Sequence, residues 1–389
     1  MRRALILALG ATLCTTGLAV AAPADQAPAK AATWKPTRNA MGQPDLSGYW
    51  SNATLTPLTR NARISNKATL TAEEAKAFEK VWAQALADSD APTSPDASTE
   101  TVQASTLASK LVEIRPDFIA AGGDTGGYNT FWIDPGTRLV EIDGQYRTSI
   151  LTTPNGLPAP RKPGAPVPPG FGQYRDLYDS YENRPHGERC ISGFGRNSGP
   201  PMLPNGYYNN NYQIIQTPDA VVIEVEMIHD ARIIRLGGAH RTDGQRPWMG
   251  DSIGRYEGDT LVVETTNLQE QQQFMGSWKN LKVTEWFTRL AKDKVLYRFQ
   301  VEDPDTWDKP WGGEYTFNSL NGRVYEYACH EGNYALPGIL GGARQKEKEA
   351  AEAAATRRPL RPPFQVLPGR DAAPTDGRSS AWPARGPPA

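Results

Sequence analysis

The four histidines of the chain are the first candidates for chemistry, because imidazole is easily tuned for proton transfer near neutral pH. From Val221 to Leu236, apolar residues fill most odd positions, and His229 falls in the same alternation. The sequence therefore predicts His229 on the apolar face of a strand, where a pocket would make it a general base. The alternative is a buried histidine that is hydrogen-bonded within the core. Asp230 points to the opposite face, so these neighbours do not form a dyad.

A second histidine, His330, lies in the densest polar run of the chain, from Tyr325 to Tyr334. We expect His330 to act as a general acid beside His229, with Asp251 or Arg232 orienting the reacting groups. The alternative is that His330 ends a strand and caps a turn, which is a structural role.

The loop from Arg246 to Arg255 combines an aromatic, a carboxylate, a hydroxyl and guanidinium groups just before a predicted hairpin. Such groups meet ligands when they stand on loops at the mouth of a barrel. The alternative is that Asp251 and Ser252 shape a turn while Trp248 covers one end of the core. The predicted ligand-binding side chains are Trp248, Arg232, Arg255, His240 and Glu264.

No cofactor or metal is predicted. The chain has no phosphate-binding loop, no dinucleotide fingerprint and no His-x-His or His-Glu-x-x-His spacing. Acid-base chemistry without a cofactor is therefore the kind of catalysis that these residues indicate.

Three cysteines bear on the compartment. Cys14 lies in the predicted leader, which leaves Cys190 and Cys329 as an even pair. In an oxidising compartment this pair predicts a disulfide. The alternative is a nucleophilic thiol at Cys329 with His330 beside it, but sequence neighbours on a strand point to opposite faces.

The N-terminus predicts export from a bacterial-type cytoplasm. Positive charge at Met1–Arg3 precedes a mainly apolar stretch, and small residues before position 22 favour cleavage after Ala21. We expect residues 1–21 to be a signal peptide and the mature protein to be periplasmic or secreted. A membrane anchor is the alternative, and no later segment is long enough to span a bilayer.

Composition limits the partners. The formal net charge is -1 over 389 residues, so the field of the whole molecule would not attract nucleic acid or an anionic membrane. A small or oligomeric organic ligand is the expected partner, and the sequence does not indicate the oligomeric state.

The elements that position these residues are mostly short strands. Residues 22–44 read as a disordered spacer, and residues 45–127 as a region with one strand near Trp50 and one helix. Thr71 and Glu74 form a capping box, and Phe78 and Trp82 repeat at helical spacing after it.

From Tyr128 to Arg344 the hydrophobic period is two, and turn residues separate the segments. Consecutive hairpins at this spacing favour an antiparallel meander that closes into a lipocalin-like barrel, with a ligand cavity at one mouth. A β-sandwich is the alternative. Residues 345–389 are expected to be a charged helix, whose composition begins near Gly338, and a disordered Pro-rich tail after Arg361. The expected strands are 128–134, 139–142, 146–152, 212–216, 221–236, 254–256, 260–266, 283–290, 295–302, 313–317 and 324–330.

Several motifs occur between Tyr128 and Tyr334. They are Tyr-Asn-Thr-Phe-Trp from Tyr128, Trp-Met-Gly-Asp-Ser from Trp248, and Glu-Gly-Asp-Thr-Leu-Val-Val-Glu-Thr-Thr-Asn from Glu257. The run from Glu226 to Ile234 and the Tyr-Glu-Tyr-Ala-Cys-His-Glu-Gly-Asn-Tyr run from Tyr325 belong to the same set. Together these motifs resemble those of a large, mostly uncharacterised family of secreted bacterial proteins. The resemblance implies membership and no particular activity.

Two main functions follow as hypotheses. The first is a cofactor-independent lyase, isomerase or hydrolase, with His229 as base and His330 as acid. The second is a non-catalytic, lipocalin-like binding protein whose polar groups only orient a ligand. A third hypothesis is an envelope-assembly protein without a cavity.

Overall fold

The structure is a computed structural model that describes residues 34–62, 64–90, 134–168, 178–193, 196, 199–205 and 208–357. The predicted signal peptide, the segment from 91 to 133 with its Tyr128 motif, and the tail from 358 lie outside these residues.

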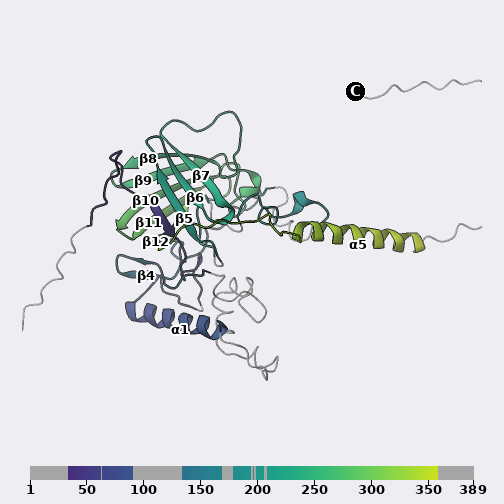
Figure 1. Cartoon of the computed structure of the whole chain (residues 1–389), viewed down its shortest axis with the longest axis horizontal. Helices are drawn as coiled ribbons and strands as arrows, with labels where there is room; N and C mark the ends of the chain where they lie inside the picture. The colour runs from purple at the N-terminus through teal and green to yellow at the C-terminus, as the bar shows by residue number, and fades with distance from the viewer. Residues whose placement is uncertain are drawn as a thin grey trace, which may run out of the picture. The chain divides into compact units, whose positions relative to one another are not determined.

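Nine strands in the described part of the chain form a closed β-barrel (Figure 1). Their order around the wall is β1-β12-β11-β10-β9-β8-β7-β6-β5, and β5 pairs with β1 to close it. Closure leaves no free edge in the wall, and the predicted barrel is confirmed over the β-sandwich. The strands are β1 (Gly48–Ser51), β5 (Asn211–Gln216), β6 (Ala220–Val225), β7 (Asp230–Leu236), β8 (Asp251–Glu257), β9 (Thr260–Thr266), β10 (Lys282–Ala291), β11 (Lys294–Glu302) and β12 (Trp311–Ser319).

One pair of strands departs from the expected antiparallel meander. β7 and β8 run parallel, with Ile234 opposite Ser252, whereas the other neighbours around the wall are antiparallel. A parallel pair cannot be joined by a tight hairpin, because the chain must return along the strands. The segment 237–250 makes this return and carries His240 and Trp248.

The predicted strand from Val221 to Leu236 is interrupted by a turn, the 3-10 element η3 (Met227–His229). Ile228 and His229 have positive φ angles of 61° and 46° there. This backbone reverses the chain into β7, so the single strand expected from the alternation is a hairpin.

The turn changes which residues of β7 face the interior. Arg232 and Ile234 are buried, while Ala231 and Ile233 are exposed. His229 is exposed in the turn, so the expectation that it stands on the apolar inner face is wrong. The alternation of apolar residues continues through the turn in the sequence, but in the structure the turn changes which positions face the interior.

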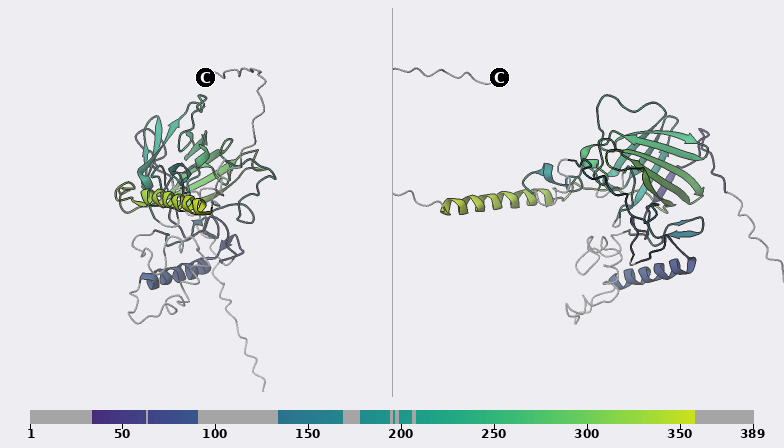
Figure 2. Two further views of the ribbon diagram at one scale, coloured as in Figure 1. Left: turned by 90° about the vertical axis from the view of Figure 1, so that its right-hand side faces the viewer. Right: turned by 180° about the vertical axis from the view of Figure 1, so that it is seen from behind.

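A small sheet and the first helix lie beside the barrel wall. β2 (Thr69–Leu70), β4 (Gln145–Arg147) and β3 (Glu141–Ile142) form the sheet, so the strands expected near 139–152 are not part of the barrel. In both views of Figure 2, α1 (Ala72–Asp90) lies to one side of the barrel.

The predicted capping box of α1 is confirmed. The Thr71 backbone N–H donates to Glu74 Oε2 at 2.9 Å, and the Glu74 N–H donates to Thr71 Oγ1 at 3.2 Å. Trp82 of this helix is buried in a satellite core with Leu55 and Leu139.

Residues 34–44, expected as part of a disordered spacer, pack over one end of the barrel. The Gln43 side chain donates to the carbonyl of Thr217 at 3.3 Å, and Leu46 just beyond is fully buried. Leu46 N–H donates to Gln216 Oε1 at 2.7 Å. These hydrogen bonds and the burial of Leu46 oppose the entropy that would keep a polar spacer disordered.

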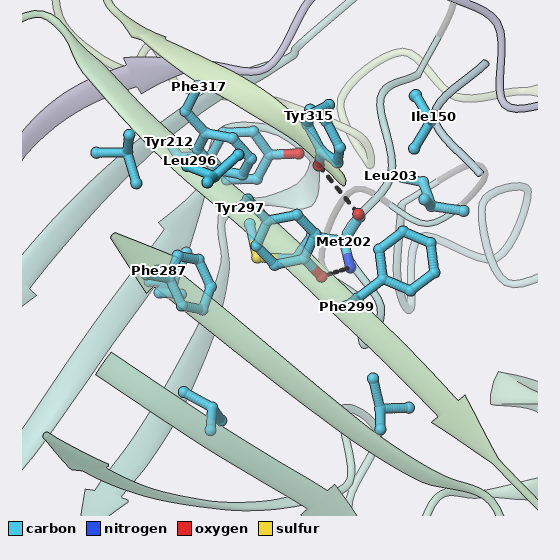
Figure 3. Packing of buried hydrophobic residues seen from close by; sticks show 14 of the residues in the cluster. Ile150, Met202, Leu203, Tyr212, Phe287, Leu296, Tyr297, Phe299, Tyr315 and Phe317 are labelled. Carbon is cyan, nitrogen blue, oxygen red and sulfur yellow. Dashed lines mark hydrogen bonds between the residues drawn. The ribbon is translucent and has the colours of Figure 1, made fainter. Parts of the chain in front are cut away.

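The other end of the barrel is filled by the segment 199–205. Met202 is fully buried, and its backbone N–H donates to the Tyr297 hydroxyl at 2.8 Å. Tyr315 in turn donates its O–H to the Met202 carbonyl at 3.0 Å (Figure 3). The expected open mouth is therefore occupied by protein side chains, and aromatic residues fill the interior behind it.

The segment after β12 is not a strand, although the sequence predicts one over 324–330. It is held to the barrel by side chains. The Cys329–Cys190 disulfide, which the sequence predicts, is formed, and the Tyr325 N–H donates to Glu226 Oε2 at 3.0 Å.

Residues 178–184 and 333–357 belong to a separate compact unit. Its described part contains the 3-10 element η2 (Tyr181–Asn183) and α5 (Ala335–Arg357), which the sequence expects from about Gly338. Arg344 Nη2 donates to the Asp179 carbonyl at 2.7 Å within this unit. Among the helices of the described residues, none has both the length and the apolar composition needed to cross a bilayer.

Candidate functional site

A groove of about 920 Å³ lies on the outer wall of the barrel, over strands β9 to β12. This volume is at the upper end of the range for small-molecule sites, so there is room for a ligand with more than one ring. The residues that line it are Thr152, Thr153, Pro154, Asn155, Leu157, Pro158, Ala159, Pro160, Thr260, Trp286, Thr288, Arg298, Phe299, Gln300, Lys309, Pro310, Trp311, Gly312, Gly313 and Glu314.

One side of the groove is the Pro-rich segment 152–160, which backbone pairing fixes against β12. Thr152 N–H donates to the Gly312 carbonyl at 3.0 Å, and Glu314 N–H donates to the Ile150 carbonyl at 2.9 Å. A Cβ atom at Gly313 would stand only 2.7 Å from the Ile150 oxygen, so this close approach requires glycine. The prolines that follow stiffen the segment.

The floor of the groove is a row of outward-facing side chains across three strands. Trp286 of β10 is directly opposite Arg298 of β11, and Arg298 is directly opposite Glu314 of β12. Side chains opposite each other in a sheet have Cβ atoms about 5 Å apart. An aromatic face, a cation and a carboxylate are therefore neighbours in this row. Beside them, the hydroxyls of Thr260 and Thr288 are hydrogen-bonded at 2.7 Å.

The carboxylate in this row is already neutralised by two cations. Glu314 accepts from Arg147 Nη2 at 2.6 Å and from Arg298 Nε at 2.9 Å, and its side chain is 12% exposed. Arg298 is 53% exposed, and Lys309 is also exposed in the groove. The charge that the groove offers to a ligand is therefore positive.

Three of the predicted site residues meet at a different place, where the 237–250 segment crosses the wall. His240 lies between two carboxylates, with Nδ1 3.0 Å from Asp251 Oδ2 and Nε2 3.3 Å from Glu264 Oε1. A protonated imidazole can donate to both carboxylates, and a neutral one to only one of them. Asp251 thus fixes one side of the ring, and Glu264 lies beside its other nitrogen.

Asp251 is the buried member of this cluster, with a side chain that is 5% exposed. Burial acts to raise the pKa of its carboxyl, but hydrogen bonds from the Arg241 backbone N–H, from His240 and from Arg235 outweigh burial and lower the pKa. The carboxylate is therefore a fixed negative charge that ties the segment to β8.

The His240 cluster and the groove belong to the same outer surface. Glu264 is opposite Thr284 on β10, and Thr284 is opposite Gln300 on β11, which lines the groove. At about 4.8 Å per strand spacing, Glu264 is about 10 Å from Gln300 across the sheet. A ligand that extends beyond the groove along this row would reach His240.

The two histidines predicted as base and acid do not come together with these residues. His229 is exposed in the β6–β7 turn, and His330 is exposed next to the disulfide. Neither lines the groove on the wall. The structure therefore does not form the acid-base pair that the sequence predicts.

Trp248 and Arg255, two predicted ligand-binding residues, also lie apart from the groove. Trp248 makes an edge-to-face contact with His186, with ring centroids 4.7 Å apart. Burial, followed by the nearby charge of Arg189, lowers the pKa of His186 to about 4. Arg255 is exposed on β8, where its Nε donates to Glu257 at 2.8 Å.

Arg232, the last of the predicted residues, is enclosed in the barrel interior. It forms an ion pair with Glu285, and the two side chains are 1% and 0% exposed. Arg232 Nη2 also donates to Thr265 Oγ1 at 2.9 Å, and Tyr297 donates its O–H to Glu285 at 2.8 Å. Burial acts to lower the pKa of Arg232, but the charge of Glu285 outweighs it and raises the pKa. The buried polar groups of this network are paired with one another, and the network is not open to a ligand.

Sequence reasoning missed the groove residues Trp286, Arg298 and Lys309. A signal was available, because the even positions from Lys282 to Thr288 are polar or aromatic while Val283 and Phe287 are apolar. A tryptophan in the polar half of an alternating strand faces outward, and Trp286 is half-buried in the groove.

Within the ranges that the structure describes, no three His, Cys, Asp or Glu side chains are grouped as ligands for a metal ion.

No family model matches this chain, and no curated protein matches it. Membership in the family of secreted bacterial proteins stays a prediction. Among solved structures, the chain is similar to a mutant of the fluorescent protein UnaG, at 14% sequence identity and a TM-score of 0.20. The match covers 39% of this chain and 89% of that chain.

Proposed function

We propose that this protein is an exported binding protein, and that it binds an oligomeric organic ligand in the groove on the outer wall of its barrel. The row of Trp286, Arg298 and Glu314 on the groove floor is the observation that carries the proposal. An aromatic face packs against the apolar face of a ring, and flanking polar groups fix its orientation. A rigid sheet holds all three side chains in place, which lowers the entropy cost of binding.

The barrel interior is the less favourable place for the ligand. A lipocalin-like mode needs an open lumen, whereas here Met202 occupies one end and Leu46 is buried at the other. A ligand in the lumen would have to displace close-packed side chains, which costs several kcal/mol. The outer groove needs no such displacement.

Export is part of the proposal. The Cys190–Cys329 disulfide supports it, because structural disulfides form and persist in oxidising compartments. The leader-like sequence before Pro23 gives the same indication.

The first experiment measures binding of a panel of neutral and acidic tetrasaccharides, by calorimetry, to the mature protein and to two variants. Trp286→Ala removes the aromatic face of the groove and is expected to weaken binding by at least about tenfold, equivalent to roughly 1.4 kcal/mol. Trp248→Ala, which removes a half-exposed tryptophan elsewhere on the same barrel, is the matched control and should bind normally. A panel without any binder, or a loss confined to Trp248→Ala, would contradict the proposal.

Catalysis on the bound ligand is a second candidate function. It is favoured by His240, which stands between Asp251 and Glu264. Glu264 is about 10 Å from Gln300 of the groove along the same face. We expect His240 to exchange a proton with a ligand that extends past Gln300, while Asp251 orients the ring.

Incubation of the protein with each tetrasaccharide that it binds, followed by mass spectrometry of the products, tests this role. His240→Gln should abolish product formation and leave the affinity measured by calorimetry unchanged, because His240 does not line the groove. An unmodified ligand after prolonged incubation with the native protein would leave binding as the whole function.

A further inference from the structure

The charge balance of the groove points to a particular class of ligand. Its charged lining residues are Arg298, Lys309 and Glu314, and Glu314 is already paired with both Arg147 and Arg298. Glu314 is therefore a poor partner for a cationic ligand, whereas Arg298 and Lys309 can still bind an anion.

Arg298 is the cation best placed for an anion. Among the described residues its hydrogen bond runs from Nε to Glu314, so its two terminal nitrogens keep their donors. A guanidinium presents these donors in a plane that matches the two oxygens of a carboxylate. The half-exposed side chain can make this contact without losing Glu314.

Trp286, directly across from Arg298, sets the distance between the ring and the anion. With Cβ atoms about 5 Å apart, a ring that packs on the indole face carries its substituents within reach of the guanidinium. A six-membered ring with one carboxylate substituent has these dimensions. A long flexible anion without a ring would leave the indole unused.

The remaining polar groups of the groove both donate and accept hydrogen bonds. Asn155 and Gln300 are amides with both donors and acceptors, and the hydrogen-bonded pair Thr260 and Thr288 keeps one O–H donor and acceptor lone pairs. Hydroxyl groups on a ligand require this dual capacity, whereas phosphates and carboxylates only accept. The groove therefore matches a ligand with many hydroxyls and few charges.

We propose that the ligand is an acidic oligosaccharide, bound with a sugar ring on Trp286 and its carboxylate paired with Arg298. This inference rests on the proposed binding function and specifies the chemistry of the same groove. Lys309 meets a second carboxylate along the chain of sugars. The net charge of -1 then matters little, because the attraction is local to the groove and not a field of the whole molecule.

Calorimetry with three probes tests the inference: tetragalacturonate, neutral maltotetraose, and a short poly-L-glutamate that has carboxylates but no sugar ring. We expect tetragalacturonate to bind at least about tenfold more tightly than maltotetraose, since a charge-assisted contact contributes this much. Its affinity should fall as NaCl is raised from about 50 mM to about 500 mM. Poly-L-glutamate should bind more weakly than tetragalacturonate, because it cannot use the indole face.

Arg298→Gln should reduce the affinity for tetragalacturonate by about tenfold or more and should reduce the affinity for maltotetraose by a much smaller factor. Arg298→Lys keeps the charge without the planar pair of donors and should lie between the two. Arg255→Gln removes an equally exposed arginine of β8 that pairs with Glu257, and it should behave as the native protein. Thermal melting of each variant separates a loss of affinity from a loss of folding.

The outcomes separate this inference from the proposed function. Equal binding of the neutral and acidic tetrasaccharides, unchanged by Arg298→Gln, would overturn the acidic class and leave the groove as an oligosaccharide site. Poly-L-glutamate binding as tightly as tetragalacturonate would also overturn it, because the groove would then recognise the carboxylates without the sugar ring. A failure of all three probes to bind would count against both proposals.

Discussion

At the scale of single residues, two neighbours on one strand can face opposite sides of the barrel wall. Asp251 faces outward and holds His240, whereas Ser252, its neighbour, faces inward and accepts from Arg232 Nε at 3.2 Å. Two residues that look alike as candidates in the sequence thus belong to different networks. Asp251 supports the partly exposed His240 on the outer face, and Ser252 is part of the buried network.

The inner network yields a prediction about stability. Glu285→Gln leaves the Arg232 guanidinium buried without its counter-ion, and breaking a buried pair in this way costs about 3 to 5 kcal/mol. The double variant Arg232→Met with Glu285→Leu removes both charges and should be more stable than Glu285→Gln alone. Urea unfolding followed by circular dichroism measures both. A single variant within about 1 kcal/mol of the native protein would mean that water reaches the pair.

At the scale of elements, the alternation of the sequence was sufficient for the barrel and for most strand positions. The strands β9, β10 and β11 lie within a residue of the expected segments or extend them by one, and the capping box marked the start of α1. These features are local, because period-two burial and caps depend on residues that are close in the sequence.

The features that the alternation did not predict are those that depend on tertiary contacts. The η3 turn has two residues with positive φ and no glycine at either position, so no turn residue marked it. Glu226 accepts hydrogen bonds from the Asn209 side chain at 2.7 Å and from the Tyr325 backbone N–H at 3.0 Å. These contacts with distant residues help to hold the turn. This turn places His229 on the outside of the barrel. The prediction of a general base in the interior is therefore wrong.

The groove residues also depend on tertiary structure that the sequence does not reveal. Trp286 and Arg298 stand on different strands, and only the β10–β11 register places them opposite each other. A slip of one residue between the two strands would leave Trp286 and Arg298 on opposite faces of the sheet. The sequence indicates that each is on a polar face, but their juxtaposition is a property of the sheet.

At the scale of the whole molecule, the barrel has one weak seam. β1 is the shortest strand of the wall and pairs with β12 through only Trp50 and Ser51. The Cys190–Cys329 disulfide joins the segment that leads to β5 with the segment that follows β12, and β5 and β12 are the two neighbours of β1. The bridge therefore links the segments next to the two strands that flank β1.

This arrangement predicts where the molecule opens when the disulfide is removed. The bridge closes a sequence separation of 139 residues, and the loss of such a constraint costs up to about 5 kcal/mol in the chain-entropy model. Replacing both cysteines by serine should lower the free energy of unfolding by a few kcal/mol. Hydrogen exchange should become faster first in β1 and in residues 320–332, because the seam has the fewest ladder hydrogen bonds. Exchange that rises equally in β9, β10 and β11 would mean that the bridge stabilises the barrel only through the unfolded chain. Exchange concentrated at the seam would show that it also holds the wall closed in the folded protein, which keeps the outer groove on a rigid sheet.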